Sequence, residues 1–484
     1  MARVLRPRVF VALASLGVLC VGVAAWPFTV DDAFVTARYA ARLAAGRGLT
    51  FVDGPPSDGV TGPLWLLPGV VAAWLGASAV DAQKWLGLCM MVMSGGLVVQ
   101  RASRRAGGAL AGPLVALLVV SGPTLGVWGV AGLETGAATL ALTGALLAAD
   151  ARPRPRALVV GLCVGALAWL RPEACAAGGV ALLAVLVRGE RRAASTALGV
   201  AVALGVAVLG YRLALFGHAL PLALAAKPGD LAWGVRYAGL GALVTTGGAG
   251  LALAAFAGGR ARGGERWLLA AVVVHLCAVG LAGGDWMPGF RLLAPILPVA
   301  ALLAGVRAAR GFTLTRSRVT RALLALAVLL AFVVPALDLV VQLPEVRAAG
   351  EARERVGRPF ARYLAAHARR VALVDVGFLA WVGGFDAVDL GGITEDGVAR
   401  RPGPHLGKRI DAAWLLARAP DALVLHATVP PEVDADGTLR TLAGYPVERR
   451  VAAMPGIRAR FRVARVVDYA PGYVYVVLLP RTAP

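Results

Sequence analysis

The sequence has little charge, and its charge is uneven. Only 16% of the 484 residues are charged, 58% are hydrophobic, and 49 Lys or Arg stand against 28 Asp or Glu. Lysine is scarce, because the only three are Lys84, Lys227 and Lys408. A soluble protein this apolar could not cover its surface with polar side chains. We therefore expect a membrane protein, and its Arg, Ala and Gly usage is typical of a GC-rich bacterial genome.

Several kinds of chemistry lack sequence support. The five cysteines lie in apolar stretches and form no CxxC pair: Cys20, Cys89, Cys163, Cys175 and Cys277. The chain has no GxxxxGK[ST] loop, no GxSxG, no HExxH and no GxGxxG after a strand, so nucleotide hydrolysis, serine hydrolysis and a zinc site are not indicated. It also has no continuous basic stripe with interleaved aromatics. We expect no cofactor, no metal site and no nucleic-acid partner.

Long apolar blocks dominate the first two thirds of the chain. Their length of about 15 to 25 residues matches the thickness of a bilayer. Eleven blocks lie near 9–26, 83–100, 109–128, 134–149, 157–170, 174–187, 194–216, 236–257, 267–283, 292–309 and 323–342. The stretch 62–76 is short and contains Pro68, so we expect it to be re-entrant or to lie along the membrane surface. The prediction is an α-helical polytopic membrane domain over residues 1–342 with about 11 transmembrane helices.

Arginine clusters predict the orientation of these helices. If 62–76 does not cross, six Arg-rich segments share one side: the N-terminus with Arg3, Arg6 and Arg8, then 101–105, 150–156, 188–192, 258–266 and 306–321. The positive-inside rule makes that side cytoplasmic. If 62–76 did cross, every later cluster would move outside. We therefore expect a cytoplasmic N-terminus and an extracytoplasmic C-terminus in a bacterial cytoplasmic membrane.

Residues 343–484 differ from the rest, because they contain no apolar run long enough to span a membrane. The stretches 371–377, 421–426 and 473–480 have the composition of strands, and 345–370 has the periodicity of a helix. We expect a small extracytoplasmic α/β domain of about 140 residues.

Two adjacent acids, Asp31 and Asp32, follow the first span, in the predicted outer loop 27–82. The helix expected after them carries Val35 and Tyr39 on one face and Arg38 on another, so it would lie on the membrane surface. One acid can cap this helix, but the cap leaves the other acid without a role.

Further ionisable and aromatic side chains fall near the predicted outer ends of spans: Glu134, Arg171, Glu173, Lys227, Asp285, Trp286 and Arg291. Each has a structural alternative: a hairpin turn at 283–291, a snorkelling Lys227, or an ion pair between Arg171 and Glu173. Taken together, they favour a cavity in which carboxylates serve as a base and cations hold a phosphate.

An ordered set of motifs resembles the GT-C superfamily of integral membrane glycosyltransferases. The motifs are DDAFVTARYAARLAAGRGLTF (31–51), DGVTGPLW (58–65), GLET (132–135), LRPE (170–173), FGHALPLALAAK (216–227), GGDWMPGFRLLAP (283–295) and DLGGITEDGVAR (389–400). They resemble in particular the branch with the terminal arabinofuranosyltransferases of the mycobacterial cell envelope. The resemblance covers nearly the whole chain, although no single motif is strong. Two departures concern substrate identity: DGVTGP replaces the usual Glu-Gly-x-Thr-Ser, and Leu222 replaces an Asn.

The resemblance implies a transferase whose donor is a polyprenyl-phosphate-linked sugar and whose reaction inverts the anomeric carbon. It implies that Asp31 or Asp32 is the general base that takes a proton from the acceptor hydroxyl. The implied donor-phosphate residues are Arg38, Lys227 and Arg291, and the implied sugar or acceptor residues are Glu134, Asp285 and Trp286.

Two other functions remain open from the residues. A transporter or flippase of a lipid-linked glycan would more often show inverted repeats and mid-membrane charges. A structural or assembly protein would not depend on the acid pair. Pentose and hexose donors, and glycan, lipid and protein acceptors, are all compatible with the sequence, and membrane lipids are expected partners.

Overall fold

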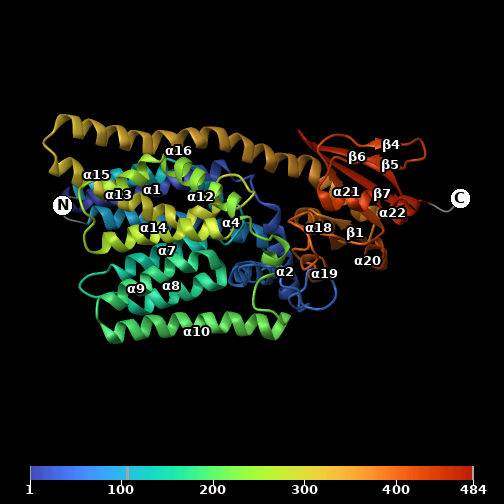
Figure 1. The fold of residues 1–484 in the computed structure, drawn as a ribbon, viewed down its shortest axis with the longest axis horizontal. Helices are drawn as coiled ribbons and strands as arrows, with labels where there is room; N and C mark the ends of the chain where they lie inside the picture. Colours follow the sequence, from blue (N-terminus) through green and yellow to red (C-terminus); the bar gives the residue numbers. More distant parts are fainter. Residues whose placement is uncertain (1, 105–107, 482–484) are drawn as a thin grey trace.

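The computed structural model describes residues 2–104 and 108–481. Arg105, in one predicted cytoplasmic cluster, lies outside these ranges. Figure 1 shows a bundle of long helices whose axes follow the long dimension of the molecule. A strand-containing domain caps one end of this bundle, and the N-terminus lies at the opposite end.

All eleven predicted blocks are helical. Their helices are α1 (Ala2–Ala24), α4 (Ala79–Ser103), α5 (Gly108–Val120) with α6 (Thr124–Gly129), α7 (Thr135–Ala149), α8 (Ala157–Leu170), α9 (Cys175–Val187), α10 (Arg191–Phe216), α12 (Leu231–Thr246) with α13 (Ala249–Phe256), α14 (Gly264–Leu281), α15 (Leu297–Leu314) and α16 (Arg318–Ala352). Among the described residues, six helices are long and apolar enough to cross a membrane, or seven if α12 and α13 count as one bent span. The other four segments are shorter apolar helices of 13 to 15 residues. The predicted polytopic helical fold is confirmed.

The bend between α12 and α13 measures 87°. Gly247 and Gly248 form it with positive φ angles of 63° and 62°. A Cβ at Gly247 would stand 2.3 Å from the carbonyl oxygen of Leu330 in α16. Only glycine therefore allows both the left-handed backbone and the close approach of α16 at this point.

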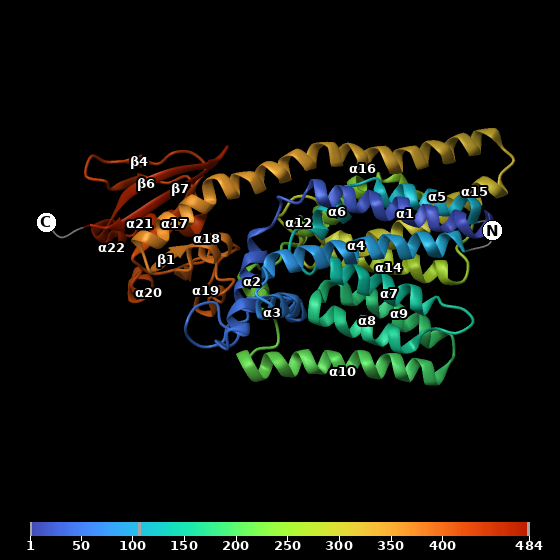
Figure 2. The ribbon, with the colours of Figure 1, turned by 180° about the vertical axis from the view of Figure 1, so that it is seen from behind.

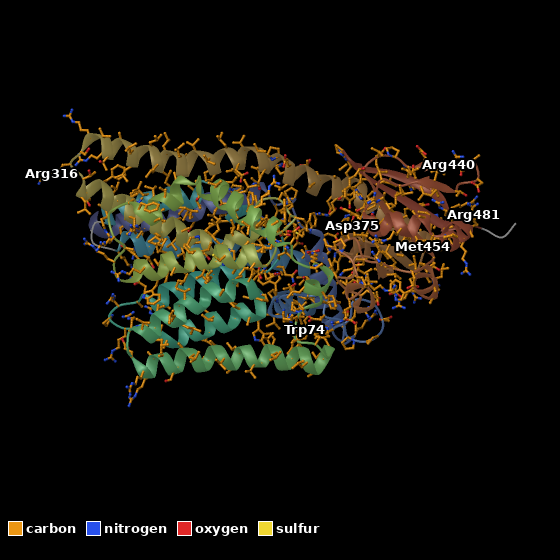
Figure 3. The ribbon with its side chains drawn as sticks, in the orientation of Figure 1. Trp74, Arg316, Asp375, Arg440, Met454 and Arg481 are labelled. Atoms are coloured by element: carbon orange, nitrogen blue, oxygen red, sulfur yellow. The ribbon has the colours of Figure 1, made fainter. Side chains whose placement is uncertain are left out.

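The stretch 62–76 forms a short 3-10 turn, η1 (Pro63–Trp65), and the nine-residue helix α3 (Leu66–Trp74). The helix packs between α2 (Asp31–Ala44) and α4 at the end of the bundle that carries the C-terminal domain (Figure 2). Trp74, labelled in Figure 3, donates its indole N–H to the Ala44 carbonyl over 3.1 Å. Helix α4 then leads back through the bundle from this same end (Figure 2).

Helix α16 leaves the bundle and continues through a π-helical turn, η4 (Arg353–Gly357), into α17 (Arg358–His367). The boundary predicted at residue 342 therefore falls inside α16. A five-stranded sheet follows, in the order β2-β1-β3-β7-β6. Its strands are β1 (Arg370–Leu373), β2 (Asp386–Asp389), β3 (Ala422–Ala427), β6 (Phe461–Ala470) and β7 (Tyr473–Pro480). Strand β1 runs parallel to β2 and β3, whereas β7 runs antiparallel to β3 and β6.

Short elements complete the C-terminal domain: α18 (Val376–Gly383), α19 (Asp396–Ala399), α20 (Ala412–Ala417), the β4 (Glu432–Val433) and β5 (Leu439–Thr441) hairpin, α21 (Pro446–Ala453) and α22 (Pro455–Arg460). The predicted strand segments correspond to β1, β3 and β7. The small C-terminal α/β domain is thus confirmed, and the long strand β6 is an addition to the prediction.

Helix α2 joins this domain to the bundle. It packs against α3 on one side and α18 on the other, and its residues Ala33–Ala40 are buried. Phe34 of α2 meets Phe378 of α18 edge to face, with ring centroids 5.0 Å apart. The helix is therefore enclosed by protein on two sides, unlike the membrane-surface helix that its amphipathic pattern predicts.

Candidate functional site

A polar cavity of about 170 Å³ lies where the bundle meets the C-terminal domain. Its walls come from the start of α2, the loop 59–61, the segments around 133–134, 171–173, 223–227 and 282–292, and Ile393 of the C-terminal domain. The ionisable side chains in its lining are Asp32, Glu134, Arg171, Glu173, Lys227, Asp285 and Arg291. Five residues of the predicted site therefore share one cavity. Asp31, Arg38 and Trp286 are not part of its lining.

Lys84 holds the turn that presents the acid pair. It is buried in the first turns of α4, and its ammonium donates to the carbonyls of Trp26 and Phe28 and to the Thr29 hydroxyl over 2.6 to 3.1 Å. These groups belong to the chain between α1 and α2. A buried ammonium with three acceptors is well satisfied, so Lys84 anchors the start of α2 at the cavity.

Asp31 and Asp32 have different partners, because successive residues of a helix point about 100° apart. The carboxylate of Asp31 accepts the backbone N–H groups of Gly377 and Phe378 at 2.8 Å each, at the start of α18. These two hydrogen bonds attach the C-terminal domain to α2. Burial and the neighbouring Asp375 carboxylate raise the pKa of Asp31 to about 7, although the Phe378 N–H opposes this. Asp375 lies at the junction of the two parts (Figure 3).

Asp32 faces the cavity, and its Oδ2 lies 3.4 Å from the ammonium of Lys227. Burial alone raises the pKa of a carboxyl group, but the charges of Lys227 and Arg291 outweigh it here and lower the pKa of Asp32. Without substrate, this carboxylate is therefore ionised and paired.

Arg291 is the second cation of the cavity. It forms an ion pair with Asp285, and its guanidinium lies 5.7 Å from the ring centroid of Trp128. The Trp128 indole in turn donates to the Gly289 carbonyl over 3.1 Å. The position of Arg291 is therefore set by a carboxylate and a buried ring together. Trp286, by contrast, is 63% exposed and is not part of the cavity lining.

Arg171 is the third cation of the cavity, after Lys227 and Arg291. Its guanidinium lies 2.8 Å from Glu134 and 3.2 Å from Glu173. The ion pair between Arg171 and Glu173, one of the structural alternatives, therefore exists, and Glu134 joins it. All three side chains also line the cavity, so they are available to a bound sugar. Within the described chain, no group of three or more His, Cys, Asp or Glu side chains is arranged to hold a metal ion.

Arg38 lies in the junction between α2 and the C-terminal domain rather than in a phosphate site. Its guanidinium donates to the carbonyls of Phe51, Ala380 and Phe385 over 2.9, 2.6 and 2.9 Å. The side chain is buried. Because its donors are already used by the backbone, we assign Arg38 to holding the domains together.

The C-terminal domain also holds the segment that carries Lys227. The short helix α11 (Leu222–Ala226) ends directly before this lysine. Ile393 packs against α11, and Lys408 donates to the Ala225 carbonyl over 2.8 Å. His405 lies close enough to Lys227 to feel its charge, and burial together with that charge lowers the pKa of His405 to about 4. The sequence motifs did not indicate His405 or Lys408.

Asp389 shapes the loop that brings Ile393 to the cavity. Its buried carboxylate accepts the N–H groups of Gly391, Gly392 and Thr394 over 2.7 to 2.9 Å and the Thr394 hydroxyl over 3.0 Å. The pattern Asp-x-Gly-Gly-x-Thr over residues 389–394 is the signal that could have found this loop. It belongs to the DLGGITEDGVAR motif, to which no role was assigned.

Residues 344–476 match a family described as a domain of unknown function, DUF8728. No curated protein matches the chain in sequence.

The fold is similar to that of ArnT from Cupriavidus metallidurans. The crystal structure of ArnT bound to undecaprenyl phosphate matches with a TM-score of 0.58 and 14% identity, over 97% of this chain and 97% of that one. The structure of ArnT in the apo state matches with a TM-score of 0.56 and 15% identity, over 99% and 98%. At this identity the likeness concerns the fold, and it confirms the GT-C type of fold that the sequence predicts.

Proposed function

We propose that this chain is a glycosyltransferase that moves a sugar from a polyprenyl-phosphate donor to a hydroxyl group of an envelope glycan, lipid or protein. The observation that carries the proposal is the cavity at the bundle end, where Asp32 faces Lys227 and Arg291. The similarity in fold to ArnT, which was crystallised with undecaprenyl phosphate, supports a lipid-linked donor.

Asp32 is the general base in this proposal. The acceptor oxygen forms a bond to the anomeric carbon from the face opposite the phosphate, so the configuration inverts. The bond between that carbon and the phosphate oxygen breaks, and its electron pair leaves with the polyprenyl phosphate. The hydroxyl proton passes to the Asp32 carboxylate. Lys227 and Arg291 stabilise the charge that develops on the phosphate, because both are cations in the same cavity.

Asp32 is preferred over Asp31 because their partners differ. Asp31 binds two backbone N–H groups and does not line the cavity. The carboxylate of Asp32 has one cation partner at 3.4 Å and faces the space that a substrate would fill.

The remaining charged lining suits the sugar. Glu134, Glu173 and Asp285 offer carboxylate oxygens to hydroxyl groups, and the arginines beside them fix the positions of these acids. The resemblance to arabinofuranosyltransferases makes a pentofuranosyl donor the first to test, with hexosyl donors second.

The proposed location is the bacterial cytoplasmic membrane, with the cavity on the outer face. Arginine-rich loops lie at the bundle end opposite the cavity. In Figure 3, Arg316 marks that end, and Asp375 marks the junction near the cavity. The positive-inside rule makes that end, and the N-terminus, cytoplasmic. Nucleotide sugars are absent outside, so a donor carried by a membrane lipid fits this placement.

The test is transfer of radiolabelled sugar from a panel of polyprenyl-phosphate donors by the purified full-length chain. Asp32→Asn should lower transfer by about 10²- to 10⁴-fold, as expected for loss of a general base. Asp53→Asn is the matched control, because Asp53 is an exposed carboxylate of the same outer loop that pairs with Arg42 outside the cavity. This variant should keep most of the activity. Equal activity of Asp32→Asn and the wild type would rule out this base. Asp32-dependent movement of a lipid-linked glycan across liposomes, without transfer, would favour a flippase.

A further inference from the structure

Of the cavities at the bundle end farthest from the C-terminal domain, two lie beside the end of α7, one on each side. The first, of about 400 Å³, is enclosed by α4, α7, α8 and the loop 150–156. The second, of about 620 Å³, is enclosed by α7, α9 and α14. Arg152 lines both. Neither cavity has a part in the proposed transfer, because the candidate site lies at the opposite end of the bundle.

The first cavity is strongly basic. Of the residues that the structure describes, four arginines line it, Arg101, Arg104, Arg152 and Arg156, and no carboxylate does. The nearby Asp150 is an ion-pair partner of Arg101. Orientation in a membrane requires arginines on one side of the bundle, but it does not require these four arginines to line the same cavity.

Part of this arginine cluster has a structural role. Arg101 donates to the Asp150 carbonyl over 2.9 Å, and Arg188, in the second cavity, donates to the Ala149 and Ala151 carbonyls over 2.8 and 3.0 Å. These bonds satisfy carbonyl groups at the end of α7. Arg104 and Arg156 are exposed at the mouth of the first cavity, so their charges are accessible to a ligand.

The same cavity continues into apolar surface. Leu97, Leu147 and Val159 form its walls. About one turn farther along each helix from the bundle end, Met93 of α4 and Leu162 of α8 are large apolar side chains that are exposed on the surface. In a membrane these side chains face acyl chains. The site therefore combines a basic pocket at the end of the bundle with exposed apolar side chains on the same helices, and this combination fits an amphiphile better than a free anion.

We propose that the first cavity binds the headgroup of an anionic phospholipid, with its phosphodiester between Arg104, Arg152 and Arg156 and its acyl chains along α4 and α8. Basic pockets between transmembrane helices are suited to such headgroups. Removing two arginines from a membrane-surface site should weaken binding by roughly 30-fold.

The experiment titrates the full-length chain in detergent with phosphatidylglycerol or phosphatidylcholine and counts bound lipids by native mass spectrometry. The wild type should bind phosphatidylglycerol in preference. The double variant Arg104→Gln with Arg156→Gln should bind it roughly 30-fold more weakly. Arg104→Lys with Arg156→Lys should keep most of the binding, because the charges remain.

The matched control removes two arginines from the same bundle end, outside the cavity: Arg316→Gln with Arg318→Gln. This control should bind like the wild type.

An unfolding temperature without lipid equal to that of the wild type shows that the Arg104→Gln with Arg156→Gln variant is folded. Equal phosphatidylglycerol binding by the Gln variant and the wild type overturns the proposal, and so does equal binding of phosphatidylcholine. Competition by glycerol phosphate at the lipid's own concentration overturns it as well, because the site would then recognise a free phosphate.

Discussion

Replacing Lys227 with methionine should move the acidic limb of the transfer reaction to higher pH. Lys227 Nζ lies 3.4 Å from Asp32 Oδ2, and the two side chains are 25% and 27% exposed. Coulomb's law gives about 1 kcal/mol for this distance in water and about 5 kcal/mol at an effective dielectric constant of about 20. Because both groups are a quarter exposed, solvent screening favours the lower part of this range, about 1–2 kcal/mol.

The sign follows from the charges around Asp32. Burial raises the pKa of Asp32, while Lys227 and Arg291 lower it to a value below the ordinary one. The ionised base of the wild type is therefore lost only when the pH falls through this lowered pKa. Without Lys227, burial is opposed mainly by Arg291, so the pKa rises and the base becomes protonated at a higher pH. The same change occurs naturally if a donor phosphate draws Lys227 away, which would make Asp32 a stronger base only when the donor is bound.

The assay is the pH profile of kcat/KM for sugar transfer, compared between the wild type, Lys227→Met and Lys227→Arg. The Arg variant keeps the charge and should restore the wild-type limb. Arg47→Met removes an exposed cation of the predicted outer loop and should leave the profile unchanged. Superimposable profiles for Lys227→Met and the wild type would refute the pairing of Asp32 with Lys227 as the cause of its lowered pKa.

Two further predictions concern the attachment and shape of the C-terminal domain. Asp389→Asn should destabilise the loop 389–394 by about 2–4 kcal/mol, because the new amide NH2 group would face the Thr394 N–H, which the carboxylate oxygen now accepts. Thermal unfolding of the intact protein measures this loss, and an unchanged unfolding temperature would contradict it. Arg38→Met should remove the guanidinium donor from the carbonyls of Phe51, Ala380 and Phe385. The Ala380 carbonyl keeps the Gly384 N–H as a partner, so the cost falls mainly on the other two carbonyls and should be about 2–4 kcal/mol. Limited proteolysis should then release the C-terminal domain sooner than in Arg47→Met, and equal cleavage rates would count against this role of Arg38.

The helical part of the fold could be predicted because a membrane span leaves a local signal. Each of the eleven apolar blocks coincides with helix, including α12 and α13, whose bend at Gly247 no hydropathy pattern reveals. The strand segments around β1, β3 and β7 were also visible, since buried strands read as short apolar runs. The mixed order of the sheet depends on contacts between distant segments, and composition does not carry that information.

The candidate site could be predicted only in part. Asp32, Glu134, Lys227, Asp285 and Arg291 were found as polar residues near the ends of spans, and the fold brings them to one cavity.

The expectations about Asp31 and Arg38 depended on what covers α2. An isolated amphipathic α2 exposes both residues, but α18, more than 300 positions later in the chain, supplies the N–H groups for one and a carbonyl for the other. Long-range partners of this kind leave no periodic trace near residue 31.

The C-terminal domain is part of the cavity rather than an appendage. Asp31 fixes the start of α18, while Lys408 and Ile393 hold α11, whose end carries Lys227. The two cavity residues proposed to exchange partners during transfer, Asp32 and Lys227, therefore each sit next to a contact with this domain. A shift of the domain would change the distance between base and cation, because their neighbours are tied to it at separate points. The segment matched to the family of unknown function, 344–476, supplies these contacts in this chain. We propose that it sets the spacing of the groups on which the proposed reaction depends.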